Sequence, residues 1–137
     1  MNSARVVVVR LWIVRAILLF ATLLYFEIGR RFLLDPAATI GRFGIALPQP
    51  VALTTIRAIM SAFFFGLSVT AFYGLILRKR AVASLWVMVT FIFFVLCGRI
   101  LGIQIDGADA INLSELRNEA MGFTLYVVAL ILMPRQG

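Results

Sequence analysis

Residues 81–105 read AVASLWVMVTFIFFVLCGRILGIQI, and Arg99 is the only charged side chain among them. A helix of about 20 apolar residues, rising about 1.5 Å per residue, crosses the ~30 Å hydrocarbon core of a bilayer. The stretch is long enough for that and has no polar face to turn toward water. It therefore predicts a membrane-spanning helix, and similar runs decide the rest of the fold.

The whole chain has the composition of a membrane protein. Of its 137 residues, 63% are hydrophobic and 14% are charged, and the mean hydropathy is +1.04. Soluble domains have roughly half apolar and about a quarter charged residues. A chain of this length cannot hide so much apolar surface within itself, so an ordinary water-soluble domain is excluded.

Three further runs complete the prediction. Residues 11–29 and 56–77 carry few charges, whereas the last uncharged run, 120–133, has 14 residues and would reach only ~21 Å as a helix. We therefore start the fourth helix at residue 113 and end it at 133, with Asn112 as its N-cap and Glu115 completing a capping box. The predicted fold is all-α, an integral membrane four-helix bundle with up-down topology, forming a single transmembrane domain over residues 1–137. The N-terminal run is interpreted as the first span and not as a cleaved signal peptide, because no A-x-A cleavage site follows it.

The distribution of Lys and Arg predicts that both termini are cytoplasmic. In that orientation the outer loops hold three basic residues, Arg30, Arg31 and Arg42, whereas the cytoplasmic side holds Arg5, Arg10, Arg15, Arg78, Lys79, Arg80 and Arg135. The formal net charge of +7 is then explained by membrane orientation and contact with anionic lipids. We expect a bacterial inner (cytoplasmic) membrane protein whose partner is the lipid bilayer, and we do not expect nucleic acid as a partner.

The connection over residues 30–55 is long enough to hold structure of its own. Asp35-Pro36 is typical of an N-cap followed by proline at the first helical position, which predicts a short interfacial helix from there toward Gly41. An ordered coil over the mouth of the bundle is the equal alternative. Pro48 and Pro50 keep the chain extended before the second span.

Small residues predict which helix faces pack, because helices in lipid associate where their backbones can approach closely. The second span has such a residue at every fourth position, and the third span has a GxxxG pair. We expect these residues to face neighbouring helices and the Phe63, Phe64, Phe65 cluster to face lipid in part. The small residues are Ala58, Ala62, Gly66, Thr70, Gly74, Gly98 and Gly102.

Charges at membrane depth mark the candidate site, because they are costly there. Arg99 and Glu119 each lie about six residues from the predicted outer ends of their helices, so both should be ~9 Å below that boundary and form an ion pair. Arg57, Asp106 and Glu27 lie near the same boundary. These five residues predict a single polar layer at the outer mouth.

Two interpretations of this layer remain open. The charges neutralise one another and lock the bundle, or they form a site for an amphipathic ligand such as a lipid headgroup or a quinone. The absence of histidine excludes bis-histidine haem, histidine-ligated metals and His-assisted nucleophilic catalysis, and the single Cys97 cannot form an internal disulfide. We therefore predict no metal, no catalytic residue and no cofactor other than a bound lipid or quinone.

The chain resembles a bacterial family of small four-helix membrane proteins catalogued as a domain of unknown function. The resemblance lies in Arg57 and Gly66, in the stretch GRILG at residues 98–102 that leads to Asp106, and in Glu119. It implies the four-span fold and the same charged positions, with no activity to transfer.

The leading functional hypothesis is a non-enzymatic accessory or packing subunit of a membrane assembly, either a homo-oligomer or a larger complex. The alternative is a lipid- or quinone-binding protein with an outer-leaflet site around Arg57, Arg99 and Glu119. A small oligomeric channel or carrier is the third hypothesis, although it would need more polar residues along one helix face.

Overall fold

The computed structural model describes residues 3–134 and is helical throughout, with no strand in that range. The helices are α1 (Ser3–Leu34), α2 (Pro36–Gly41), α3 (Pro50–Ile76), α4 (Arg78–Asp106) and α5 (Ala110–Leu132). The all-α class predicted from the sequence is confirmed. Arg135, one of the basic residues assigned to the cytoplasmic side, lies outside the described residues.

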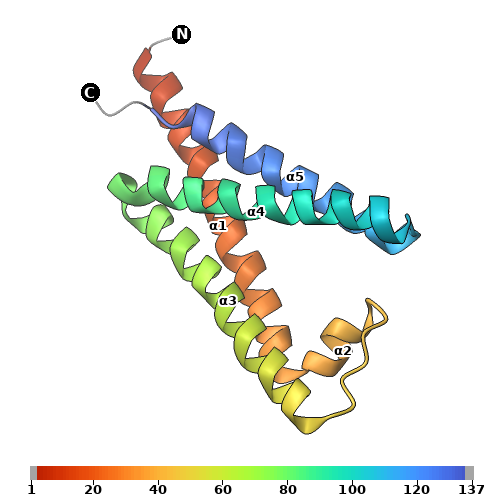
Figure 1. Cartoon of the computed structure of the whole chain (residues 1–137). Helices are drawn as coiled ribbons and strands as arrows, with labels where there is room; N and C mark the ends of the chain where they lie inside the picture. The colour runs from red at the N-terminus through yellow and green to blue at the C-terminus, as the bar shows by residue number, and fades with distance from the viewer. Residues whose placement is uncertain (1–2, 135–137) are drawn as a thin grey trace.

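The four long helices form two antiparallel pairs, α1 with α3 and α4 with α5 (Figure 1). The pairs meet where the N-terminal half of α1, the α3–α4 turn and the C-terminal half of α5 come together, which we call the closed end (Figure 1). From there the two pairs diverge toward what we call the open end, where the α1–α2–α3 connection and the α4–α5 turn lie (Figure 1). The four helices therefore do not pack along their whole lengths.

The apolar core lies toward the closed end. It is built from α1 residues such as Leu18 and Ala21, from Ala71 of α3, from Leu85 of α4 and from Ala129 of α5, each of which is fully buried. Near the point where the pairs diverge, Tyr25 stacks on Phe64 of α3 and meets Phe91 of α4 edge to face. These contacts join all four long helices at one end only.

Most of the remaining apolar surface is uncovered. Only 17% of the most apolar 18-residue window of α1 is buried, and the corresponding shares are 28% for α3 and 33% for α4. Such exposed hydrophobic surface is stable in hydrocarbon and not in water. Three helices, spanning Arg5–Leu34, Pro50–Ile76 and Arg78–Asp106, are long and apolar enough to cross a membrane. The membrane prediction is confirmed to that extent.

The fourth predicted span corresponds to α5, which is not among these three helices. Its first half carries the charges of Glu115, Arg117 and Glu119, and these lower its hydropathy relative to the other helices. The arrangement of four spans in up-down order therefore remains a prediction.

The helices are longer than the apolar runs that predicted them. The first begins at Ser3 instead of residue 11 and the second at Pro50 instead of residue 56, because a helix continues past the hydrocarbon boundary and proline suits its first position. The predicted short helix is present as α2, with the Asp35 carboxylate accepting a hydrogen bond from the amide of Ala38 at 3.0 Å.

The predicted N-cap of the last helix is wrong. Asp109 caps α5, and its carboxylate accepts a hydrogen bond from the amide of Asn112 at 2.6 Å. The side chain of Asn112 instead accepts a hydrogen bond from Arg99. Because the carboxylate of Asp109 caps α5, the side chain of Asn112 is available to accept the hydrogen bond from Arg99.

The predicted packing face of α3 is also wrong for most of its residues. Ala58, Ala62 and Gly66 are exposed, and Thr70 is only half-buried. The helix packs instead through a neighbouring face, whose buried residues are Ser61, Leu67, Ser68, Ala71 and Gly74. Ser68 donates a hydrogen bond from its hydroxyl to the carbonyl of Thr22 in α1 at 2.8 Å, so small side chains do mediate the contact, but on a different face.

Gly74 is the one member of the predicted file that packs closely. A Cβ atom at this position would lie 2.7 Å from the Cβ of Ser84 in α4, so the α3–α4 crossing requires glycine. By contrast, a Cβ at Gly66 or Gly98 would meet nothing within 4 Å. The GxxxG pair of α4 therefore does not pack within the chain.

Candidate functional site

An ion pair between α4 and α5 is the least exposed ion pair among the described residues. Arg99 donates from Nε to Oε2 of Glu119 at 2.7 Å and from Nη2 to Oε1 at 2.6 Å. Its Nη1 donates to Oδ1 of Asn112 at 3.2 Å. The two charged side chains are only 21% and 12% exposed, and a bidentate arginine–carboxylate pair is the geometry that best offsets such loss of water.

The short α4–α5 turn brings these residues to one level. Gly107 ends α4 with a φ of 97°, a left-handed conformation that favours glycine, and Asp109 begins the next helix. Arg99 lies seven residues before the end of α4 and Glu119 nine residues after the start of α5, which corresponds to about 11 and 14 Å along the two axes. Antiparallel packing therefore places them side by side, as their spacing indicated.

Arg57 does not join this ion pair. It lies on α3 and donates from Nη1 to the carbonyl oxygens of Leu33 and Leu34, at 3.2 Å for Leu34. Arg57 thus satisfies the last carbonyl groups of α1, which have no partner within their own helix. Arg57 is hydrogen-bonded to α1 and Arg99 to α5, so the structure does not join the predicted charges into one cluster. The two helix pairs to which these residues belong diverge toward the open end (Figure 1).

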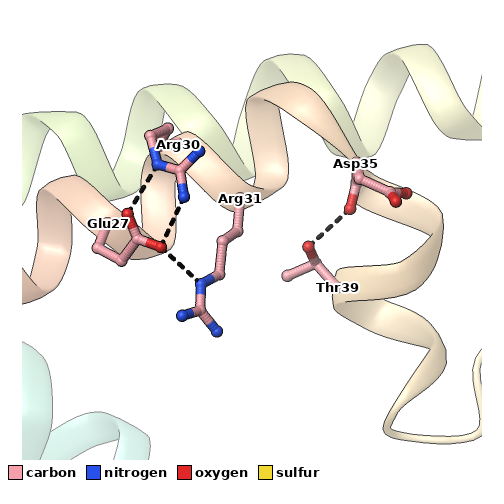
Figure 2. Close-up of polar contacts among 5 residues, drawn as sticks. All are labelled: Glu27, Arg30, Arg31, Asp35 and Thr39. Atoms are coloured by element: carbon pink, nitrogen blue, oxygen red, sulfur yellow. Dashed lines mark hydrogen bonds and ion pairs between the residues drawn. The ribbon is translucent and has the colours of Figure 1, made fainter.

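Glu27 also has its own local partners. It accepts hydrogen bonds from Arg30 at 2.7 and 2.9 Å and from Nε of Arg31 at 2.9 Å, all within one turn of α1 (Figure 2). Just beyond, the hydroxyl of Thr39 donates to the backbone carbonyl of Asp35 at 2.6 Å (Figure 2). This cluster stabilises the end of α1 and the start of α2, apart from the Arg99 pair.

Asp106 ends α4 without an ion pair among residues 3–134. It lines a hollow of about 300 Å³ together with Arg99, Asn112, Gly98 and Gly102. The two glycines have no side chain to fill this space. One carboxylate, one side-chain amide and one guanidinium therefore line this hollow on the surface of the α4–α5 pair.

One contact across the open end was missed by the sequence reasoning. Nη2 of Arg42, just after α2, lies 3.6 Å from Oε1 of Glu115 in α5. The residues are 73 positions apart, and no local pattern pairs them. This ion pair connects the α2 segment with the α4–α5 pair where the helices themselves have separated.

The chemistry available here is recognition and charge neutralisation. Within residues 3–134 no group of three or more Cys, Asp or Glu side chains is placed to hold a metal ion. The described part of the chain also leaves no buried side-chain nitrogen or oxygen without a hydrogen-bond partner. Arg99, Asp106 and Asn112 present hydrogen-bonding groups to the hollow between α4 and α5.

Tyr126 points inward, as a tyrosine at membrane depth should. It is 2% exposed, and its hydroxyl donates to the hydroxyl of Tyr25 at 3.2 Å, which links α5 to α1. Its partner was not identifiable from sequence, because the two tyrosines are 101 residues apart.

Comparison with known proteins adds no relative. No protein-family model, no curated protein and no solved structure matches the chain.

Proposed function

We propose that this chain is a small multi-pass membrane protein of non-enzymatic type that acts as an accessory or packing subunit of a membrane assembly. It would cross the bacterial inner membrane four times, with both termini cytoplasmic, as the resemblance to a four-span family and the Lys and Arg distribution suggest. The observation that carries the proposal is the exposed small-residue surface of α3.

Ala58, Ala62 and Gly66 lie along one face of α3 and are all exposed. Small residues at every fourth position let a second helix approach closely, and in lipid such packing replaces hydrophobic burial as the source of stability. The chain itself does not use this surface, so it is available to a helix of another subunit. The charged side chains of Arg99, Arg57 and Glu27 are meanwhile engaged within the chain, which leaves them poorly suited to catalysis.

The test is the mass of the particle and its protein content after purification in mild detergent. We expect a homo-oligomer or a stoichiometric partner polypeptide, and we expect Gly66→Leu to release it because the leucine side chain blocks close approach. Phe72→Leu, at an exposed position about 120° around α3 from Gly66, is the matched control and should leave the assembly intact. A wild-type protein that is monomeric and without a partner polypeptide would overturn the proposal.

The hollow beside Arg99 favours a second candidate function, the binding of a lipid headgroup or a quinone. Its residues offer hydrogen bonds to a polar head, and apolar Val95 and Ile103 line it as well. Arg57 contacts α1 instead, so this candidate site rests on Arg99, which Glu119 holds in place, and on Asp106 and Asn112.

Gly98→Leu tests this second candidate because it fills the hollow without touching the ion pair. A quinone or phospholipid found by mass spectrometry in the wild type and lost in the variant would support binding. Retention of the same molecule in the filled variant would refute it.

A further inference from the structure

We propose that the closed end of the protein binds the phosphate group of an anionic phospholipid between Arg15 and Arg78. These residues belong to α1 and to the start of α4, and both line one hollow of about 230 Å³. The site is distinct from the Arg99 hollow and needs only the membrane location of the protein.

The closed end has a large excess of positive charge. Arg10, Arg15, Arg78, Lys79 and Arg80 lie in its helices, whereas all six acidic side chains lie elsewhere in the sequence. Glu27 is the acidic residue nearest to Arg15 on α1, twelve positions away, or about 18 Å along the helix. No carboxylate side chain of the protein can therefore neutralise Arg15 or Arg78.

The open end differs in this respect, because Arg30, Arg57 and Arg99 each have an oxygen partner within the chain there. In the described residues, the one specific contact of the Arg15 guanidinium is with the ring of Trp12, at 5.8 Å from the ring centroid. An arginine without a counter-charge at the edge of a membrane requires an external anion or water. Phosphate is the anion whose oxygens best match the planar, forked donors of arginine.

The rest of the hollow explains why the anion should belong to a lipid. Its walls include the apolar side chains of Leu11, Leu18, Leu75 and Met133. These residues come from α1, from α3 and from the end of α5, which meet at the closed end (Figure 1). A free inorganic anion gains nothing from such walls, whereas a lipid places its headgroup at the arginines and its chains against apolar surface. Anionic lipids at a membrane surface are also attracted by neighbouring basic residues such as Lys79 and Arg80.

The experiment is a lipid titration of the purified full chain in mild detergent, followed by native mass spectrometry. The probes are phosphatidylglycerol, phosphatidylcholine with the same acyl chains, and inorganic phosphate. We expect one phosphatidylglycerol to bind at least about tenfold more tightly than phosphatidylcholine, with no binding of inorganic phosphate at the same concentration. Equal affinity for the two lipids, or binding of free phosphate alone, would overturn the proposal.

Two variants locate the site. Arg15→Gln/Arg78→Gln should weaken phosphatidylglycerol binding about tenfold, whereas Arg10→Gln/Arg80→Gln, which removes the same charge at the same end but not from the hollow, should change it less than about threefold. Arg78→Gln alone, at the exposed first position of α4, provides a variant that keeps the fold if the double variant does not, and it should lose about threefold. Equal losses in the two double variants would reduce the effect to general surface charge and refute the site. Because partner polypeptides are not measured here, this result is independent of the proposed subunit role.

Discussion

Removing Glu119 from its ion pair tests the structural interpretation of the charged site. In Glu119→Ala, Arg99 keeps only its hydrogen bond to Asn112. Its side chain is 21% exposed in the intact pair. Breaking a buried ion pair by removing one partner costs about 3–5 kcal/mol in soluble proteins. Partial exposure and the polar partners available in a membrane-inserted unfolded state reduce this figure, so we expect a loss of about 2 kcal/mol.

The double variant Arg99→Ala/Glu119→Ala separates the pair from its surroundings. It removes both charges, so no uncompensated guanidinium remains, and we expect a loss smaller than the sum of the two single variants by at least about 1 kcal/mol. The free energy of unfolding can be measured by SDS titration in mixed micelles, followed by tryptophan fluorescence. Arg117→Ala, an exposed position on the same helix, is the control and should change stability by less than about 0.5 kcal/mol.

The result that would refute this reasoning is additivity. If the double variant loses as much stability as the two single variants together, the bidentate contact has no coupling energy. If Glu119→Ala behaves like the Arg117 control, the charges are solvated independently, and the pair does not hold α4 against α5.

Three further predictions concern contacts between helices. Gly74→Ala should lower the free energy of unfolding by about 1–3 kcal/mol, measured in the same SDS titration, because its Cβ would lie 2.7 Å from a side-chain atom of α4. Arg42→Glu should lower the free energy of unfolding by up to about 1 kcal/mol in the same titration, because it places two like charges where Nη2 and Oε1 now lie 3.6 Å apart. Tyr25→Phe should cost about 1 kcal/mol, since it leaves the hydroxyl of Tyr126 without its 3.2 Å hydrogen bond inside the protein.

Each of these predictions has a control that can contradict it. Gly66→Ala, where a new Cβ meets nothing within 4 Å, should be neutral or stabilising by up to about 1 kcal/mol, and an equal loss at Gly66 and Gly74 would show that crowding is not the cause. The charge-reversed pair Arg42→Glu/Glu115→Arg should recover the stability of the wild type to within about 0.5 kcal/mol, and a double variant that loses as much as Arg42→Glu alone would mean that the two side chains do not meet. Tyr25→Phe/Tyr126→Phe should lose less than the two single variants together, whereas an additive loss would argue against the shared hydrogen bond.

The elements that the sequence predicted well depend on residues close together in the chain. Asp35 and Pro36 specify the start of α2 because a cap is an interaction between near neighbours. The common level of Arg99 and Glu119 follows from counting residues on either side of a short turn. Both depend on helix geometry alone and need no knowledge of how the helix pairs are arranged.

The failures share one physical cause. Ala58, Ala62 and Gly66 form a regular file, but the neighbouring face of α3 packs against α1. In lipid there is no hydrophobic gain that selects one apolar helix face over another, so the choice depends on the shapes of side chains on both helices. Arg57 was assigned to the wrong partners for a related reason, since the sequence does not show that its side chain turns toward the end of α1.

The amino-acid sequence by itself therefore determined that this is a helical membrane protein with charges placed near helix ends, because hydropathy and spacing are properties of each segment alone. The tertiary structure alone decided that the helices diverge in two pairs, that Arg42 reaches Glu115 and that Arg15 and Arg78 share a hollow. Those contacts join residues more than sixty positions apart, and they arise from the packing of whole helices against one another.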